Sequence, residues 1–338
     1  MGHRGGMPSI PIPAGKIPVE LLTRVLAAHP PLPPEVQLGP AVGEDACAID
    51  IEAGVLIAAT DPITLTTADL GRYGVIVNAN DVAVMGVRPR WFLAAVLLPL
   101  GTTDDMVEQL FATMGDALDE VGATLVGGHT EVTAAVNQPV IVGQMLGVSP
   151  DGRYVRTAGA RPGDVLVQVG SAPIEGAAVL AVEAADRLTG ISAEVVAAAA
   201  RGLRDPGISV VDAALTAATL GATAMHDPTE GGIASGLQEL AVAAGVAVRV
   251  ERSQLIWFEP GLDVCRALGA DPWATLASGS LLVTFPPDRV DVAVRALSAP
   301  GRPAAVIGTI HAGAGVRGTD GGAIPRPERD EVARVLAL

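Results

Sequence analysis

The sequence has 338 residues, 49% hydrophobic and 17% charged, which is enough for two globular domains with their own cores. This composition excludes a wholly disordered chain. The formal net charge of −15 makes nucleic acids and anionic membranes unfavourable partners, and no uninterrupted apolar run is long enough for a membrane helix.

The first residues, MGHRGGMPSIPIPAGK, carry charge and proline but lack the apolar core of a signal peptide, which predicts a cytoplasmic protein. We expect residues 1–39 to form a leader with one short helix and a Pro-rich connector. Lys16 is the one lysine of the sequence. Two interpretations stay open for it: an incidental residue of the leader, or an ammonium group that closes over a phosphate.

Strand and helix patterns are mixed through residues 40–152, which predicts a first domain of α+β type. The expected strands are 46–51, 55–60, 91–100, 123–128 and 139–148, and the expected helices are 70–85 and 102–122. Thr102 or Thr103 can cap the second helix, and Gly122 can end it. The strand at 91–100 is apolar throughout, so we expect it to be buried on both faces.

The pattern breaks at SPDGRYVRTAGARPGD, and we place the second domain at residues 153–338. This part also mixes the two element types. The expected strands are 165–170, 222–227, 246–251, 280–285 and 304–310, and the expected helices are an Ala-rich one after the first strand, 231–245, and one near the C-terminal end of the sequence. The chain as a whole therefore reads as two α+β domains.

Polar residues occur where the sequence is otherwise apolar. Asp45 precedes a predicted strand, Asp61 follows one, and Asp81 lies with Asn78 and Asn80 in the expected helix at 70–85. Asn78 and Asp81 are three residues apart and share a helix face. Each acid alone fits a turn or cap residue, but three together can hold Mg²⁺, which takes one or two carboxylates and completes its shell with water and phosphate oxygens.

The strand predicted at 123–128 runs into two glycines. Gly127 and Gly128 precede His129 and Thr130 in LVGGHTEVT, and glycines in a turn let backbone N–H groups approach a phosphate. No GK[ST] follows, so this is not a P-loop. His129 fits a ligand contact, although a lone histidine in a turn is more often simply hydrogen-bonded.

Two further segments have the same character. His226 and Asp227 lie between the strand at 222–227 and the helix at 231–245, whose glycine-rich start can bind an anion. Ordinary helix capping explains the same residues equally well. Glu175 and Gly176 mark a third such turn.

Taken in order, these segments resemble the AIR synthase superfamily, and the nearest branch resembles the hydrogenase-maturation protein HypE. The resemblance covers residues of about 40 to 312, and eight motifs in the same order make it specific. They are VGEDACAI, TDPIT, NANDVAVMGVRPRWF, GGHTEVT, GARPGD, IEGAAVLA, HDPTEGGI and ASGSLLV.

The resemblance implies an ATP-binding domain at 40–152, an AIR synthase-like domain at 153–338, and a homodimer in which two N-terminal domains pair into a β-barrel. It implies Mg²⁺ and ATP as cofactors. Together with the patterns above, it assigns Asp45, Asp61 and Asp81 to the metal; Asn78, Asn80, Gly127, Gly128, His129, Thr130, Glu175 and Gly176 to ATP; and Asp227, His226 and Lys16 to catalysis.

The activity that the resemblance implies is transfer of the ATP γ-phosphoryl group to an acceptor, either a small molecule or a protein side chain. Glu230 stands where the HypE branch tends to have Arg, and the sequence ends RVLAL where HypE ends in Cys. The acceptor therefore stays open. The alternatives are an ATP-binding regulator without turnover, and a hydrogenase-maturation accessory that acts on a Cys of another protein.

Overall fold

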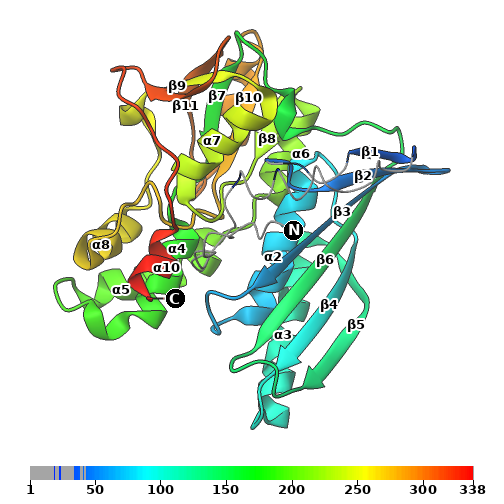
Figure 1. Cartoon of the computed structure of the whole chain (residues 1–338), viewed down its shortest axis with the longest axis vertical. Helices are drawn as coiled ribbons and strands as arrows, with labels where there is room; N and C mark the ends of the chain where they lie inside the picture. Colours follow the sequence, from blue (N-terminus) through cyan, green and yellow to red (C-terminus); the bar gives the residue numbers. More distant parts are fainter. Residues whose placement is uncertain (1–18, 20–22, 24–33, 39–40, 42, 338) are drawn as a thin grey trace, which may run out of the picture.

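The structure is a computed structural model that describes residues 19, 23, 34–38, 41 and 43–337, so Lys16 lies outside the described residues. Its described strands form two six-stranded sheets, one in each half of the chain (Figure 1). None of the helices in this described part combines the length and the apolar character that a bilayer-spanning segment needs. The predicted boundary between residues 152 and 153 stays a prediction.

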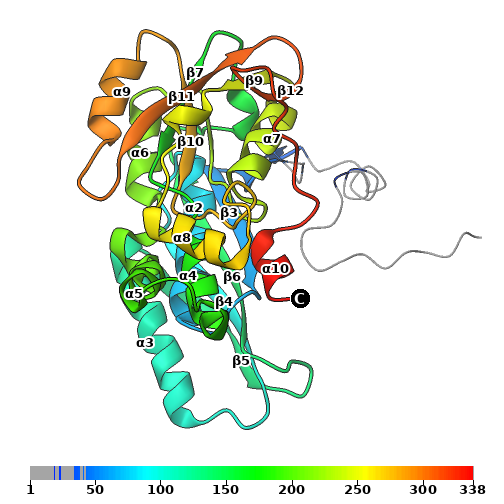
Figure 2. The same ribbon diagram turned by 90° about the vertical axis from the view of Figure 1, so that its left-hand side faces the viewer.

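The first sheet has the order β1-β2-β3-β6-β4-β5, and β4 and β5 are its one parallel pair among the described strands. Its strands are β1 (Val36–Leu38), β2 (Cys47–Ile51), β3 (Gly54–Ile63), β4 (Trp91–Leu98), β5 (Thr124–Val132) and β6 (Val140–Ser149). Helices α2 (Leu70–Val84) and α3 (Asp104–Val121) cover one face, and no described helix covers the other (Figures 1 and 2).

All fifteen residues of helix α2 are buried, as expected for a helix surrounded by protein. It packs between the first sheet, α3 and α6 (Val211–Thr219) of the second half. A Cβ atom at Gly74 would lie 2.9 Å from Cγ2 of Ile141, so glycine lets the helix approach β6 closely. The polar side chains of α2 therefore need partners inside the protein.

Helix α3 confirms the prediction from its sequence. The Thr103 hydroxyl accepts a hydrogen bond from the Met106 N–H group at 3.4 Å, and Gly122 ends the helix in a left-handed conformation. The prediction that β4 is buried on both faces is wrong. Every second residue of β4 is buried, and the residues between them are part-buried or exposed. The reason is that helices cover one face of this sheet only.

The second sheet has the order β12-β9-β11-β7-β10-β8. Its strands are β7 (Val165–Val169), β8 (Ala224–His226), β9 (Ala247–Val250), β10 (Leu281–Phe285), β11 (Ala304–His311) and β12 (Gly315–Gly318). The remaining helices are α4 (Ile174–Glu183), α5 (Ala193–Arg201), α7 (Gly232–Ala244), α8 (Glu259–Leu268), α9 (Val290–Leu297) and α10 (Glu331–Val335). Short helical turns are η1 (Thr157–Gly159), η2 (Ala185–Arg187), η3 (Leu203–Gly207) and η4 (Arg252–Gln254).

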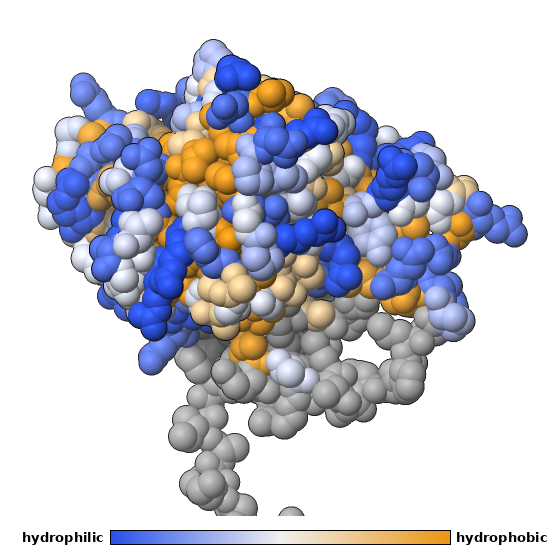
Figure 3. Space-filling view, turned by 90° about the horizontal axis from the view of Figure 1, so that it is seen from above, coloured by the Kyte–Doolittle hydropathy of each residue, from blue (hydrophilic) through white to orange (hydrophobic). Residues whose placement is uncertain are grey.

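Helix α7 lies on one face of this sheet and helices α6 and α9 lie on the other (Figure 2). One apolar cluster runs from the first half into α4, α6 and α9, so the two halves share a core. A smaller cluster lies under α7. Figure 3 looks onto the end of the molecule near the second sheet, where polar side chains line most of the outline and apolar ones gather towards the middle.

Candidate functional site

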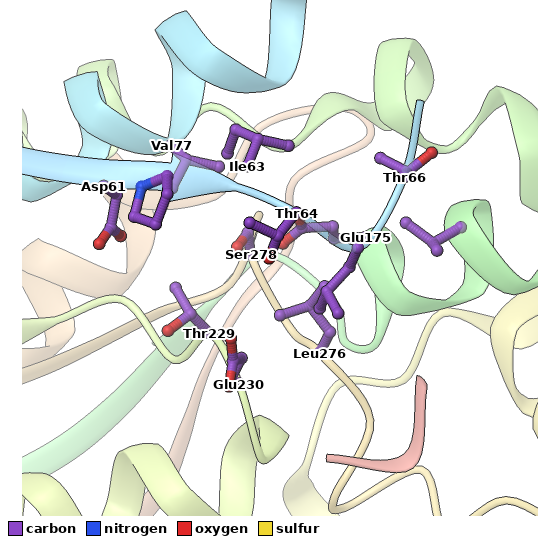
Figure 4. A pocket seen from close by; sticks show the side chains of 13 residues that line it. Asp61, Ile63, Thr64, Thr66, Val77, Glu175, Thr229, Glu230, Leu276 and Ser278 are labelled. Carbon is purple, nitrogen blue, oxygen red and sulfur yellow. The ribbon is translucent and has the colours of Figure 1, made fainter. Parts of the chain in front are cut away.

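A pocket of about 490 Å³ lies between the two halves of the chain. Strand β3, the start of α4 and the segment before α7 all contribute to its wall. In Figure 4, Asp61 lies at the left of the pocket, Thr229 and Glu230 lie below its centre, Ser278 lies near the centre, and Glu175 lies to the right. None of the described residues that line it is basic, so the pocket is acidic.

Asn78 explains one of the polar positions inside α2. Its Oδ1 accepts a hydrogen bond from the Asp61 N–H group at 2.8 Å, and its Nδ2 donates to the carbonyl groups of Asp61 at 3.2 Å and Gly74 at 2.9 Å. The side chain has no exposed surface. Asn78 thus fixes the backbone that carries Asp61, and protein groups already use its donors and its acceptor.

Asn80 and Asp81 do not line the pocket. The Nδ2 group of Asn80 donates to the Ile208 carbonyl at 2.9 Å, and its Oδ1 accepts from the Val210 N–H group at 2.9 Å. Asn80 therefore joins α2 to the segment before α6. Asp81 is 7% exposed and lies one turn after Asn78 on α2.

A chain of alternating charges, which we call the imidazole chain, joins Asp45, His226, Glu239 and Arg326. His226 Nδ1 lies 2.8 Å from Asp45 Oδ2, and its Nε2 lies 3.0 Å from Glu239 Oε2. Arg326 donates to Glu239 Oε1 at 2.8 Å. The imidazole chain thus connects the first half to β8, α7 and the segment before α10.

Both ring nitrogens of His226 have carboxylate partners. Burial favours neutral imidazole, but the carboxylates of Asp45 and Glu239 outweigh it and hold the pKa of His226 well above its usual value. A protonated ring between two acids carries charge and fixes Asp45. The predicted catalytic role of His226 stays a prediction, and its position makes it an organiser of Asp45.

Asp227 follows β8 directly and is 2% exposed. Neither of its carboxylate oxygens has a hydrogen-bond partner among the described residues. Burial, followed by the charge of Asp45, raises the pKa of Asp227 well above its usual value, although His226 acts in the opposite direction. A buried carboxylate with no donor needs a proton or a cation to be stable.

Glu175 lies in the first turn of α4 and is 6% exposed. Its Oε2 has no hydrogen-bond partner among the described residues. Burial raises the pKa of Glu175 to about 7, and the charges of Asp330, Glu230 and Asp61 add to this effect. The pocket wall therefore holds a carboxyl group whose charged form is unfavourable.

The predicted metal ligands do not form a ready-made three-carboxylate site. In the part of the chain that the structure describes, no three His, Cys, Asp or Glu side chains are placed to share one ion. Asp45 pairs with His226, and Asp81 lies outside the pocket lining. Asp61 and the unpartnered oxygens of Asp227 still suit Mg²⁺, because this ion needs only one or two carboxylates when phosphate oxygens supply the rest.

The predicted turn with Gly127, Gly128, His129 and Thr130 is wrong, because these residues lie inside β5. This strand continues because Gly128, with φ of 149°, allows close contact with β4: a Cβ atom there would lie 2.1 Å from the Ala94 carbonyl oxygen. Strands β6 and β4 separate β5 from β3 and Asp61. The structure therefore does not bring these four residues to the pocket.

The other glycines that were expected to bind phosphate use their amides within the protein. The Gly176 N–H group donates to the Leu276 carbonyl at 2.9 Å, and a Cβ atom there would lie 2.5 Å from Thr275 Cγ2. The Gly231 N–H group donates to Asp330 Oδ2 at 2.6 Å. Gly176 thus serves close packing, and Asp330 occupies the start of α7.

Three residues of this region were missed from the sequence: Glu239, Arg326 and Asp330. Asp330 caps α10 by accepting a hydrogen bond from the Val332 N–H group at 2.7 Å, and an acid before a short helix is the only signal that could have indicated it. Burial raises its pKa to about 7. Glu239 and Arg326 have no local pattern, because their partners are distant in sequence.

The match to known families is consistent with this architecture. Residues 43–149 match the N-terminal domain of AIR synthase related proteins, and residues 161–321 match the C-terminal domain. Two domains of this class, each with a mixed sheet and helices, make the predicted α+β fold correct at that level. The chain belongs to the AIR synthase-related family.

Among its relatives is carbamoyl dehydratase HypE of Rhodobacter capsulatus, 32% identical over 259 residues that cover 75% of this chain and 74% of the relative. A crystal structure of hydrogenase maturation protein HypE in complex with ATP superposes with a TM-score of 0.71 at 24% identity, covering 87% of this chain and 92% of that one. A crystal structure of a HypE–HypF complex superposes with a TM-score of 0.71 at 24% identity, covering 85% of this chain and 94% of that one. The structural likenesses show a shared fold.

Proposed function

We propose that this protein is an enzyme that uses Mg²⁺ and ATP to transfer a phosphoryl group in the pocket between its two halves. One observation carries this proposal: Asp227, two residues before Thr229 of the pocket wall, is buried, and its carboxylate oxygens have no hydrogen-bond partner among the described residues. A pocket without basic side chains attracts a divalent cation, which in turn attracts phosphates. The HypE name of a relative and the ATP in a solved HypE structure support the same activity.

Each residue of the site has a role in this proposal. Asp61 and Asp227 would hold the metal, and Mg²⁺ would neutralise charge on the phosphates. The metal-binding roles of Asp45 and Asp81 stay predictions. Asn78 keeps Asp61 in place through the backbone hydrogen bonds described above. Catalysis then depends mainly on positioning, since the protein has little covalent chemistry to perform.

Lys16 completes the proposed site by closing over the phosphates as a point charge. It lies outside the described residues, so its role depends on the sequence alone. Nucleotide affinity and turnover of Lys16→Ala test it directly. Unchanged affinity and turnover would mean that Lys16 is an incidental residue of the leader with no role at the ATP site.

The acceptor is a neutral group in this proposal. Glu230 lines the pocket opposite Asp61, and Glu175 lies beside it (Figure 4). Two acids at the acceptor end disfavour an anionic acceptor such as a second phosphate. An amide-type oxygen on a small molecule or a protein side chain fits better. A protein acceptor would agree with the HypE–HypF complex that has been solved.

The proposed enzyme is a homodimer whose first sheets face each other. All nine residues of β5 are exposed, and no described helix covers that face of the sheet. The exposed apolar side chains on β5 include Val126 at 53% and Val132 at 52%. An uncovered edge strand with apolar side chains favours pairing with a second copy of the chain. Light scattering after size exclusion tests this, because a monomer at micromolar concentration would contradict the shared barrel.

The second candidate function is ATP binding without turnover, as in a regulatory or accessory protein. The engaged ring nitrogens of His226 and the engaged Gly231 amide favour it, because neither group can act on a substrate as it stands. The third candidate is a hydrogenase-maturation accessory that uses the same site to act on a Cys of another protein. Release of ADP separates turnover from binding alone.

The test is calorimetric titration of ATP with and without Mg²⁺. We expect binding that requires Mg²⁺ in the unmodified protein, and a Kd at least about tenfold weaker in Asp227→Asn, or about 1.4 kcal/mol. Without Mg²⁺, the same substitution should not weaken binding, because it removes a like charge. Asp116→Asn, on an exposed position of α3, is the matched control. Asp81→Asn then tests the predicted role of Asp81.

A folded, unmodified protein that binds no ATP would overturn the proposal. Binding that is equal with and without Mg²⁺ would overturn the metal part of it. Binding without ADP release would select the second candidate.

A further inference from the structure

A second cavity, of about 530 Å³, lies beside the first turn of α7, where Ala234 contributes to its wall. Its wall comes from η4, the loop after α8, the segment at 323–329, and α10. The same segment carries Arg326 of the imidazole chain and leads into Asp330. The volume is comparable to that of the first pocket, and nothing proposed above uses it.

The cavity has an aromatic wall. Trp273 lines it and meets Trp257 edge to face, with ring centroids 5.5 Å apart at an interplanar angle of 68°. The Arg252 guanidinium lies 5.4 Å from the centre of the Trp273 ring, which is a cation–π distance. These contacts hold a flat indole surface in a fixed position beside a positive charge.

The cavity also has positive charge that protein acids only partly neutralise. Arg329 donates to the Ala333 carbonyl at 2.9 Å but forms no ion pair among the described residues, and its buried Nε has no hydrogen-bond partner there. The buried Nε of Arg252 also lacks a hydrogen bond, and the nearest carboxylate oxygen, on Asp320, is 3.6 Å away. Buried donors without acceptors are costly unless a ligand or water supplies them.

Two of the three acids of this wall are occupied elsewhere, and the third, Glu328, is exposed. Glu331 accepts from both Nε and a terminal nitrogen of Arg334, and its Oε2 also accepts from the Asp271 N–H group at 3.1 Å. Asp271 Oδ1 accepts a hydrogen bond from the backbone N–H group of Trp273 at 3.0 Å. Neither carboxylate therefore neutralises Arg329 or Arg252, and a planar guanidinium is suited to a carboxylate with two oxygens.

We propose that this second cavity binds a small organic anion, with its carboxylate at Arg329 and Arg252 and a flat aromatic body against Trp273. The aromatic part supplies buried apolar area, and the guanidinium groups supply orientation. Indole-3-acetate has both features and serves as the probe. Acetate has the charge without the ring.

The experiment is calorimetric titration of the full chain with each probe. We expect indole-3-acetate to bind at least about tenfold more tightly than acetate. Arg329→Gln should weaken indole-3-acetate at least about tenfold, and Trp273→Leu should abolish the difference between the two probes. Arg295→Gln, on an exposed position of α9, is the matched control and should bind as the unmodified protein does.

A substitution at the proposed ATP site separates the two sites. Asp227→Asn should retain indole-3-acetate binding, since Asp227 does not line the second cavity. Arg329→Lys provides a check on folding, because it retains the charge and should bind more tightly than Arg329→Gln. The proposal is overturned if the folded, unmodified protein binds no indole-3-acetate at about 10 mM, or if Arg329→Gln binds it as tightly as the unmodified protein.

Discussion

Asn80 provides a sharp test of how the two halves are joined. Its amide makes two hydrogen bonds, to the Ile208 carbonyl and from the Val210 N–H group, each at 2.9 Å. Asn80 and Ile208 have no exposed surface, and Val210 is 1% exposed. Asn80→Ala therefore removes both bonds and leaves two buried backbone groups without partners.

The expected loss follows from these contacts. Each lost bond with an unpartnered group costs about 1–3 kcal/mol, so Asn80→Ala should lower the free energy of unfolding by about 3 kcal/mol. Urea unfolding followed by circular dichroism measures this loss. Asn137→Ala changes an exposed asparagine and should leave the midpoint unchanged. ATP affinity, measured well below the unfolding midpoint, should stay as it is in the unmodified protein.

Two results would refute this reasoning. Unfolding of Asn80→Ala at the original urea concentration would mean that the two hydrogen bonds contribute nothing. Weaker ATP binding with unchanged stability would instead make Asn80 a cofactor ligand, as the sequence predicts.

Three further predictions concern stability, pH and assembly. Arg326→Gln removes the ion pair to Glu239 and should lower stability by about 1–2 kcal/mol, because Arg326 is part-exposed; thermal unfolding measures it. Glu175 has a pKa of about 7 in the folded protein and 4.5 when unfolded, so it binds more protons in the folded state and stability falls as pH rises between these values. At pH 8, Glu175→Gln should therefore have a free energy of unfolding roughly 3 kcal/mol higher than the unmodified protein, measured as a higher urea midpoint. At pH 4 the two proteins should unfold alike. Val126→Arg on β5 should dissociate the proposed dimer in light scattering, whereas Val292→Arg on α9 should not.

Each of these has a clear contrary result. Equal melting temperatures for Arg326→Gln and the unmodified protein would remove Arg326 from the stabilising contacts. A stability gain for Glu175→Gln that does not change with pH would mean that the carboxyl group does not titrate in this window. Dissociation by both valine substitutions would show general destabilisation of the fold.

Local patterns in the sequence predicted much of the fold. Helix α3 has its cap at Thr103 and its end at Gly122, and both signals act within a few residues. The sequence missed β1, which lies in the Pro-rich connector and pairs with β2, since three residues are too few for a pattern. It also missed β12, which has only four residues.

The site was harder to predict, because its contacts are distant in sequence. Asp45 and His226 were both singled out, but their contact spans 181 positions, and no spacing rule contains it. The sequence assigns Asn78 to ATP, and in the structure its amide contacts backbone groups of Asp61 and Gly74. The sequence predicts a turn at Gly128, because a glycine needed for close strand packing has the same sequence signal as one in a turn.

The apolar cluster that runs through both halves has a consequence for motion. A shared core opposes rotation of one half against the other, because rotation would expose buried Ala, Val and Leu side chains to water. Access to the pocket between the halves should therefore depend on local movement of the segments beside it, such as residues 64–69, on a timescale faster than global unfolding. Amide hydrogen exchange would then be rapid in those segments and slow along α2, so that ligands enter past moving loops while the frame around them stays closed.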